Sequence, residues 1–534
     1  MHDLLPDLIL HSARIGPSRP AVSRKGKSLD YAALAENTHA VAQGFLRLGL
    51  ARSERVAVYL PKLLENVTSL FGAALSGGVF VPINPLLKAD QVAHILRDCN
   101  VRILVTSSDR ACLLAELLAE CHDLNSVVVI EGAQKNLPDI AGAEILTWHE
   151  FMTQPASRRP HRVIDSDMAA ILYTSGSSGR PKGVVLSHRN LLAGARSVAR
   201  YLENTPDDRL LAVLPLSFDY GLSQLTTAFS VGASTVLMDY LLPRDIIRTV
   251  ANEGITGLAA VPSLWHQIAT LPWPSEAQTS LRYITNSGGA LPRSTLAALR
   301  RALPGTKPYL MYGLTEAFRS TYLPPEELEA RPGSMGRAIP NAEVMVVRED
   351  GSPCLPGEPG ELVHRGPLVA MGYWNDAKRT AERFRPAPGQ DPGLPLPEIA
   401  VWSGDTVKTD EDGYLYFVGR KDDMIKTSGY RVSPTEVEEV IYASGLVNQA
   451  AVLGIPHPVL GQAIVAVITP AEAGIEAILQ HCRRQLPAFM VPQQVVVRAA
   501  LPHNPNGKTD REQLHQTLRT LFDESPEHHE TDTP

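Results

Sequence analysis

The sequence predicts an α/β protein with a large N-terminal domain, a smaller β-rich unit after it and a compact C-terminal domain. In the first 330 residues, helical stretches alternate with short apolar runs at 56–60, 79–82, 103–105, 127–130, 211–214 and 234–237. This alternation is typical of strands wrapped by helices in a parallel sheet. A chain of 534 residues is also too long for one ordinary hydrophobic core, so more than one domain is expected.

The later parts of the chain differ from the first in their turns and helix signals. Beyond Gly333 the strands are shorter, and Asp-Gly or Pro-Gly pairs predict turns at 350–351, 356–357 and 412–413. A helix is expected to begin at Ser433-Pro434-Thr435-Glu436, which supplies a cap, a first-turn proline and a glutamate three residues after the cap. We therefore expect a core domain at 1–419, a C-terminal domain at 420–520 and a disordered acidic tail at 521–534.

Composition and charge exclude several classes of protein. With 44% hydrophobic and 20% charged residues, the chain is typical of a soluble globular protein. Its net charge of -7 argues against nucleic acid or anionic lipid as a partner, because both need a dense basic face. No apolar run reaches the roughly 20 residues that cross a bilayer, and residues 1–10 do not resemble a signal peptide. The five cysteines form no CxxC pair, so we expect reduced thiols in a cytoplasmic protein.

A loop rich in hydroxyls and glycines follows the apolar run at 168–172. Residues 173–183 read Tyr-Thr-Ser-Gly-Ser-Ser-Gly-Arg-Pro-Lys-Gly and combine backbone donors, hydroxyls and two cations, the groups that bind polyphosphate. A flexible polar surface loop is the alternative, and the Pro-Lys-Gly between two apolar runs favours ligand binding. A Walker loop is excluded, because Gly183 rather than Ser or Thr follows Lys182.

This loop resembles the signature segment of the AMP-forming superfamily of acyl-CoA synthetases, luciferases and peptide-synthetase adenylation domains. The resemblance covers nearly the whole chain. Five further signature segments follow in the expected order, at 286–292 (Asn-Ser-Gly-Gly-Ala-Leu-Pro), 312–316 (Tyr-Gly-Leu-Thr-Glu), 402–405 (Trp-Ser-Gly-Asp), 419–426 (Gly-Arg-Lys-Asp-Asp-Met-Ile-Lys) and 504–510 (Asn-Pro-Asn-Gly-Lys-Thr-Asp). One such match would be weak, whereas six in order are specific.

The resemblance implies both a fold and a reaction. The N-terminal domain is expected to hold two α/β sheets and a small β-barrel-like unit, followed by a small mobile α+β C-terminal domain. The expected enzyme is an AMP-forming acid–thiol ligase. It would join a carboxylic acid to ATP as acyl-AMP, release pyrophosphate, and transfer the acyl group to the thiol of CoA or of a carrier-protein phosphopantetheine. Mg²⁺ would accompany ATP.

The resemblance also assigns residues to the nucleotide. Tyr312 and the Gly288-Gly289-Ala290 backbone would enclose adenine, while Asp405, helped by Arg420, would accept hydrogen bonds from the ribose hydroxyls. Glu316 would hold Mg²⁺ as a catalytic residue. The remaining nucleotide-binding residues would be Thr174, also catalytic, with Ser175, Gly176, Ser177, Ser178, Gly179, Lys182, Gly313, Thr315 and Arg431. Taken singly, Tyr312 could be a core aromatic and Asp405 a turn residue.

The C-terminal residues would serve the two half-reactions in turn. By resemblance, Lys508 reaches the α-phosphate and the attacking carboxylate, where a cation stabilises charge that develops in the transition state. By itself, its Asn-Gly-Lys context indicates only a hairpin with a solvated lysine. Asp422 matches the hinge about which the domain rotates, although a solvated charged turn is the alternative. After rotation, Ser428-Gly429-Tyr430 would line a pantetheine tunnel.

The segment Phe218-Asp219-Tyr220-Gly221 stands where the superfamily binds its acid, together with Gly289, Gly313 and Lys508. Phe218-Asp219 looks like the pair of amino-acid-activating members, in which the aspartate meets the substrate's α-ammonium. A buried carboxylate needs a cation, so this assignment is chemically sensible. Tyr220-Gly221 departs from the usual motif, and Asp219 could instead cap a helix or pair with a nearby arginine.

Residues 87–105 and 312–336 look most like ligases associated with the exosortase A systems of bacteria, which would make a discrete acyl carrier protein as plausible an acceptor as CoA. An amino-acid ligase that loads a carrier protein is one alternative function. A nucleotide-binding protein without turnover is another, against which Glu316 and Lys508 argue. Luciferase-type oxidation rests on fold analogy alone.

Overall fold

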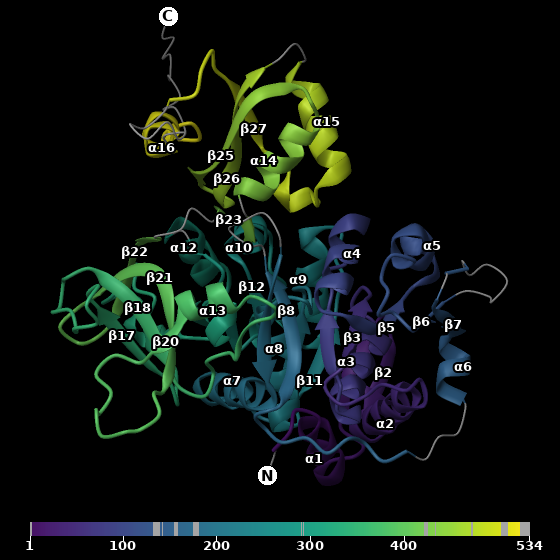
Figure 1. Ribbon diagram of the computed structural model, residues 1–534. Coiled ribbons are helices and arrows are strands. Elements are labelled where there is room, and N and C mark those ends of the chain that lie inside the picture. Colours follow the sequence, from purple (N-terminus) through teal and green to yellow (C-terminus); the bar gives the residue numbers. More distant parts are fainter. Residues whose placement is uncertain are drawn as a thin grey trace, which may run out of the picture. The chain divides into compact units, whose positions relative to one another are not determined.

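The computed structural model describes residues 3–131, 139–140, 142–153, 158–174, 181–289, 291, 293–420, 425–432, 434–470, 474–502 and 511–523 (Figure 1). These residues fall into two compact units. The N-terminal unit comprises residues 3–174 and 181–420, and the C-terminal unit comprises residues 425–523. The α/β class, with a large N-terminal domain built of sheets and a small C-terminal domain, is confirmed.

The first sheet of the N-terminal unit has eight strands in the order β19-β9-β8-β4-β3-β5-β6-β7. Its parallel part, β8 to β7, is extended by two antiparallel pairings, β8 with β9 and β9 with β19. The strands are β3 (Arg55–Tyr59), β4 (Val79–Pro82), β5 (Val101–Thr106), β6 (Ser126–Val129), β7 (Glu144–Thr147), β8 (Met168–Thr174), β9 (Lys182–Ser187) and β19 (Gly372–Tyr373). The connecting helices include α3 (Leu64–Ser76), α4 (Ala89–Asp98), α5 (Ser108–Leu118) and α6 (Trp148–Thr153).

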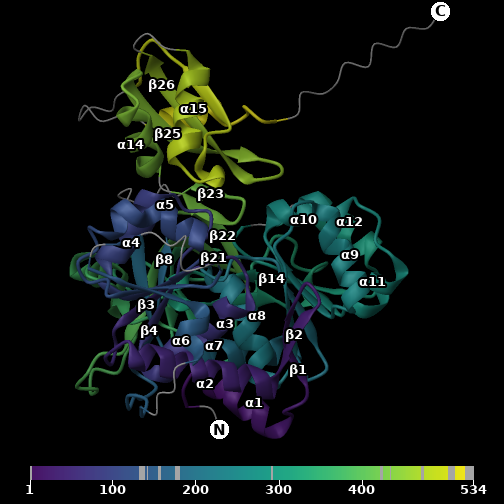
Figure 2. The same ribbon diagram turned by 90° about the vertical axis from the view of Figure 1, so that its right-hand side faces the viewer.

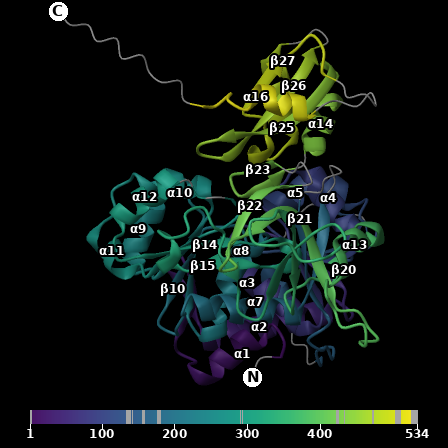
Figure 3. The same cartoon turned by 90° about the vertical axis from the view of Figure 1, so that its left-hand side faces the viewer.

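The second sheet has nine strands in the order β16-β15-β14-β13-β12-β10-β11-β1-β2. These are β1 (Pro20–Arg24), β2 (Lys27–Asp30), β10 (Arg209–Ala212), β11 (Ser234–Leu237), β12 (Gly257–Ala260), β13 (Tyr283–Asn286), β14 (Lys307–Tyr312), β15 (Thr321–Leu323) and β16 (Arg337–Ala338). Figure 3 shows four of its helices gathered at one side, namely α9 (Pro243–Glu253), α10 (Pro262–Ala269), α11 (Ser275–Ser280) and α12 (Arg293–Ala302).

One hydrophobic core joins the two sheets, and helix α3 touches both of them. Helix α3 contacts β3 and β4 of the first sheet and β1 of the second, and α8 (Asp219–Val231) packs on β10 and β11 (Figure 2). The rings of Phe71 on α3 and Phe229 on α8 meet edge to face with centroids 5.5 Å apart. Helices α1 (Asp7–Ile15), α2 (Tyr31–Arg47) and α7 (His188–Tyr201) cover this core. Because the core is shared, the ends of strands from both sheets keep fixed positions.

Helix α7 is tied to the start of the chain by a buried histidine. Ser187 and Asn190 form a capping box at its first turn. The backbone N–H of Leu5 donates to Nδ1 of His188 at 3.1 Å, so that nitrogen must be unprotonated. Burial lowers the pKa of His188 to about 4, against the attraction of Asp165 and Asp167.

The small β-rich unit predicted after Gly333 is a five-stranded antiparallel sheet. Bulges between Glu361 and Val363 and between Thr406 and Val407 interrupt its register and increase its twist. Its strands are β17 (Glu343–Val347), β18 (Gly360–Arg365), β20 (Phe384–Pro386), β21 (Ile399–Thr409) and β22 (Leu415–Arg420), with α13 (Ala377–Arg383) beside them.

The C-terminal unit is a sheet covered on both faces. Along β26, Ile464, Ala466 and Ile468 enter one core, while the alternate residues Val465 and Val467 enter the other, as the two-residue period of a strand requires. The strands are β23 (Ile425–Thr427), β24 (Tyr430–Val432), β25 (Val447–His457), β26 (Gly461–Pro470) and β27 (Gln494–Val497), and the helices are α14 (Pro434–Ala443), α15 (Ile475–Gln485) and α16 (Arg511–Leu518).

The structure bears on membrane-spanning helices and on disulfides. No helix in the described part is both long and apolar enough to cross a membrane. The five cysteines all lie within the described ranges and form no disulfide.

Candidate functional site

The hydroxyl-rich loop begins and ends at a pair of residues that face each other in the first sheet. Thr174 closes β8, Lys182 opens β9, and the two are paired in the antiparallel register. The buried Oγ1 of Thr174 has no hydrogen-bond partner among the described residues. The predicted phosphate ligands Ser175, Gly176, Ser177, Ser178 and Gly179 lie outside the described residues.

Lys182 belongs to a compact cluster with Glu316 and Tyr373. Its Nζ lies 3.3 Å from Oε1 of Glu316 and donates to the Tyr373 hydroxyl at 3.0 Å. That hydroxyl donates in turn to Oε1 of Glu316 at 2.6 Å, and Nζ stands 4.3 Å from the centre of the Tyr373 ring. The cluster thus joins the predicted phosphate lysine to the predicted magnesium ligand.

Backbone pairing positions each member of this cluster. Strand β19 places Tyr373 opposite Val184 of β9, close to Lys182. Glu316 lies on the 3-10 turn Thr315–Ala317, and its carbonyl accepts from the backbone N–H of Ala370 at 2.8 Å. Tyr373 was not among the residues predicted from the sequence, because Gly372-Tyr373-Trp374 lies outside the six signature segments.

Tyr312 and Asp405 connect the second sheet to the small β-rich unit. The Tyr312 hydroxyl donates to Oδ2 of Asp405, and the Asp405 side chain is buried. The Asp405 backbone is held by a hydrogen bond to Oγ of Ser403 at 3.0 Å. In the strand register Asp405 lies opposite Arg420, the residue predicted to help it. Two residues predicted to bind the nucleoside are therefore neighbours.

The predicted adenine-binding glycines lie at the end of β13, beside the strand that carries Tyr312. β13 and β14 are parallel, so their carboxyl ends share one edge of the sheet. Gly288 has a φ of 86°, and Nδ2 of Asn286 donates to the carbonyl of Gly289 at 3.0 Å, which closes the turn. Ala290 lies outside the described residues.

The acid-binding segment contains a buried ion pair. Oδ2 of Asp219, at the first turn of α8, accepts from Nη1 of Arg319 at 3.0 Å, and the two side chains are only 5% and 2% exposed. The sequence left three roles open for Asp219, namely binding an α-ammonium, capping a helix and pairing with an arginine. In the structure it pairs with an arginine. Gly221 is required here, because a Cβ would lie 2.0 Å from the carbonyl oxygen of Pro215.

The predicted pantetheine residues form a tight turn in the C-terminal unit. Ser428 and Gly429 both have positive φ, 51° and 82°, as the two central residues of a type I′ hairpin require. The Tyr430 ring stacks on Phe489 with centroids 3.8 Å apart. Arg431 follows on β24. The hinge residue Asp422 and the catalytic candidate Lys508 lie outside the described residues.

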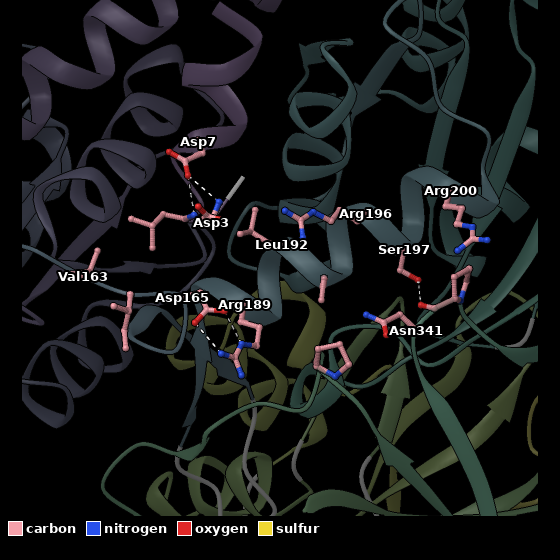
Figure 4. A pocket seen from close by; sticks show the side chains of 15 residues that line it. Asp3, Asp7, Val163, Asp165, Arg189, Leu192, Arg196, Ser197, Arg200 and Asn341 are labelled. Atoms are coloured by element: carbon pink, nitrogen blue, oxygen red, sulfur yellow. Dashed lines mark hydrogen bonds and ion pairs between the residues drawn. The ribbon is translucent and has the colours of Figure 1, made fainter. Parts of the chain in front are cut away.

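A further cavity of about 710 Å³ runs along α7 in the N-terminal unit (Figure 4). None of the residues predicted to bind nucleotide or acid lines it. Arg189 pairs with Asp165, and the Asp7 carboxylate accepts from the backbone of Asp3. Figure 4 shows Asp3, Asp7 and Asp165 toward one side of the cavity and Arg196 and Arg200 toward the other.

Comparisons with known proteins agree with this geometry. Residues 9–374 match the AMP-binding enzyme family, and residues 436–508 match the AMP-binding enzyme C-terminal domain. A long-chain-fatty-acid–CoA ligase of Salmonella typhimurium is 29% identical over an alignment 553 residues long, gaps included. The alignment covers 97% of this chain and 95% of the relative. An L-proline–[L-prolyl-carrier protein] ligase of Streptomyces coelicolor is 34% identical over 507 residues and covers 91% of each chain.

The fold is similar to that of an o-succinylbenzoate CoA synthetase double mutant from Bacillus subtilis. The TM-score is 0.82 at 24% identity, with 96% of this chain and 98% of that chain covered. An amide bond synthetase from Marinactinospora thermotolerans gives the same score and identity, with 96% and 99% covered. With the first family match spanning more than half of its length, this chain belongs to the AMP-binding enzyme family and is an AMP-forming ligase.

Proposed function

We propose that this ligase activates a carboxylic acid with ATP at the site of the N-terminal unit and passes the acyl group to a pantetheine thiol. The observation that carries the proposal is the Lys182–Tyr373–Glu316 cluster. It provides a cation for phosphate and a carboxylate for a divalent ion within one hydrogen-bonded group. The names of the Salmonella and Streptomyces relatives, a CoA ligase and a carrier-protein ligase, support the two-step reaction.

The proposed nucleotide roles follow the strand ends. Thr174 and Lys182 meet the phosphates, Tyr312 and the 288–290 backbone meet adenine, and Asp405 meets the ribose. Glu316 would hold Mg²⁺ through its carboxylate, because this ion prefers oxygen ligands and needs few of them from the protein. When bound, Mg²⁺ offsets the negative charge of the triphosphate.

The acceptor is a thiol of CoA or of a carrier-protein phosphopantetheine, which Ser428, Gly429 and Tyr430 would guide after rotation about Asp422. Lys508 would complete the adenylation state. The likeness of residues 87–105 and 312–336 to exosortase A-associated ligases favours a cytoplasmic enzyme that feeds an envelope or exopolysaccharide pathway.

A pyrophosphate-release assay with a panel of fatty, aromatic, hydroxy and amino acids tests the proposal. Glu316→Gln and Lys182→Met are expected to slow release by on the order of 10²-fold, because each removes a preorganised charge. The exposed residues Glu326 and Lys408 offer matched controls, Glu326→Gln and Lys408→Met, which should release pyrophosphate at the wild-type rate. Site variants that match their controls would contradict the assigned roles.

An amino-acid ligase that loads a carrier protein is the second candidate. The 34% identity to the proline ligase favours it. The pairing of Asp219 with Arg319 opposes it, because the carboxylate that would meet an α-ammonium already has a cation.

A further inference from the structure

We infer that the buried Asp219–Arg319 pair selects the acid, so that the enzyme activates carboxylic acids without an ammonium group next to the carboxylate. The inference rests on the proposed function, in which residues 218–221 line the acid. Arg319 then supplies, from within the chain, the positive charge that the amine of an amino acid would otherwise bring to Asp219.

The guanidinium of Arg319 is held in place on several sides. Nη1 also donates to the carbonyl of Phe318 at 2.8 Å, and Nη2 donates to Oγ of Ser223 at 3.2 Å. Its carbon lies 4.5 Å from the centre of the Tyr220 ring. At 2% exposure, the side chain has no room to swing into solvent when a substrate arrives.

The backbone around Arg319 is equally constrained. Phe318 adopts a left-handed φ of 56°, which is uncommon for a bulky residue. Its ring packs against Gly194 of α7, where a Cβ would lie 2.4 Å from the ring. Packing against Gly194 of α7, 124 positions before Phe318, therefore fixes the turn that directs Arg319 toward Asp219. The ion pair is held in place by this packing.

The pair also lies beside the other segments proposed to bind the acid. A Cβ on Gly313 would be 3.6 Å from Nη1 of Arg319 and 3.2 Å from its Cα. The Tyr220 hydroxyl and Oγ1 of Thr285 are 2.6 Å apart, which joins the first turn of α8 to the strand that leads into Gly289. The charges thus lie beside the 218–221 and 312–313 segments, and Tyr220 links them to β13, the strand that leads into the 288–289 turn.

Charge balance decides which substrates fit. The pair holds one negative and one positive charge, so an ammonium group placed against Asp219 would leave an excess positive charge in a site that excludes water. An uncompensated buried charge typically costs about 3–5 kcal/mol, which corresponds to a discrimination of roughly 10²–10⁴. An acid without the amine meets no such penalty.

Matched pairs of acids that differ only in the amine test the inference by pyrophosphate release. Suitable pairs are 3-phenylpropionate with phenylalanine, butyrate with 2-aminobutyrate, and cyclopentanecarboxylate with proline. We expect the amine-free member of the preferred pair to have at least a roughly 100-fold higher kcat/KM. Preference for the amino acid would overturn the inference, whereas no release with any acid would instead refute the proposed function.

Variants separate selection from a merely structural role. Arg319→Met leaves Asp219 without its arginine and should move the ratio of the two kcat/KM values at least about tenfold toward the amino acid. Arg319→Gln keeps a hydrogen-bond donor beside Asp219. It replaces Arg319→Met in the same measurement if the methionine variant does not fold. The double variant Asp219→Leu/Arg319→Met removes both charges and should keep the amine-free preference. A ratio unchanged in the single variants would contradict the inference, and the wild-type panel alone decides if neither single variant folds.

Discussion

Removing one hydroxyl group is expected to separate the catalytic role of the Tyr373 cluster from its packing. Tyr373→Phe keeps the ring, which packs edge-on against Phe384 with centroids 5.5 Å apart, and keeps the face above which Lys182 lies. It removes the hydroxyl group, whose oxygen accepts from Lys182 and whose O–H donates to Glu316. We therefore expect a folded protein in which these two charged side chains are less well positioned.

The size of the effect follows from the bonds that are lost. A hydrogen bond to a charged group contributes about 1.5–3 kcal/mol, and the two bonds share one oxygen, so their losses do not add. The direct contact of Lys182 with Glu316 remains. Adenylation should accordingly slow by roughly ten- to a hundredfold, since about 1.4 kcal/mol is a factor of ten.

Single-turnover pyrophosphate release measures the adenylation step, and thioester formation from preformed acyl-adenylate measures the second step. Tyr373→Phe should slow the first far more than the second. Tyr59→Phe is the matched control, because its hydroxyl donates to the carbonyl of Leu87 and none of the six signature segments contains it. An unchanged release rate, or an equal loss in both steps, would refute the reasoning.

Three further predictions concern charge and protonation. Asp219→Asn, which leaves Arg319 buried without its carboxylate, should lower the free energy of unfolding by about 3–5 kcal/mol in urea titrations, while Asp219→Leu/Arg319→Met should stay within roughly 1 kcal/mol of wild type. As pH falls from 6.5 to about 4, His188 takes up a proton in the unfolded chain but stays neutral in the folded protein. The free energy of unfolding therefore falls by up to about 3 kcal/mol. The urea midpoint of His188→Gln should therefore fall less steeply over that pH range. Lys508→Ala should slow adenylation by on the order of 10²–10³ and spare thioester formation, and equal rates in the first step would exclude its role.

The sequence pattern located buried segments well and strand ends less well. The run at 234–237 coincides with β11, and the run at 127–130 overlaps β6. The run at 211–214 is displaced, because β10 ends at Ala212 while Val213 and Leu214 stay buried in the following loop. Apolar periodicity reports burial and says nothing of which backbone groups pair. The strand order, including the pairing of β19 with β9, therefore could not be predicted.

The same limit explains which site residues were missed. The resemblance to signature segments predicted roles for Lys182, Glu316 and Asp405, because each lies within a short stretch of sequence that can be recognised locally. Tyr373 reaches the site through the pairing of β19 with β9. It lies 191 positions after Lys182, to which it is hydrogen-bonded. The sequence suggested that Asp219 could pair with an arginine but could not name it, since Arg319 lies 100 positions further along the chain.

Exposure distinguishes the Lys182–Glu316 and Asp219–Arg319 ion pairs and suggests why each is there. Lys182 is 18% exposed, so under the proposed reaction an incoming phosphate draws it from Glu316 and leaves that carboxylate to a divalent ion. Arg319 is 2% exposed and is bonded on several sides, so a substrate has no comparable route to displace it from Asp219. Buried ion pairs are seldom the most stable solution, and Nε of Arg319 has no hydrogen-bond partner among the described residues. The first pair is therefore expected to exchange during each turnover, whereas the second stays closed and acts by excluding charge.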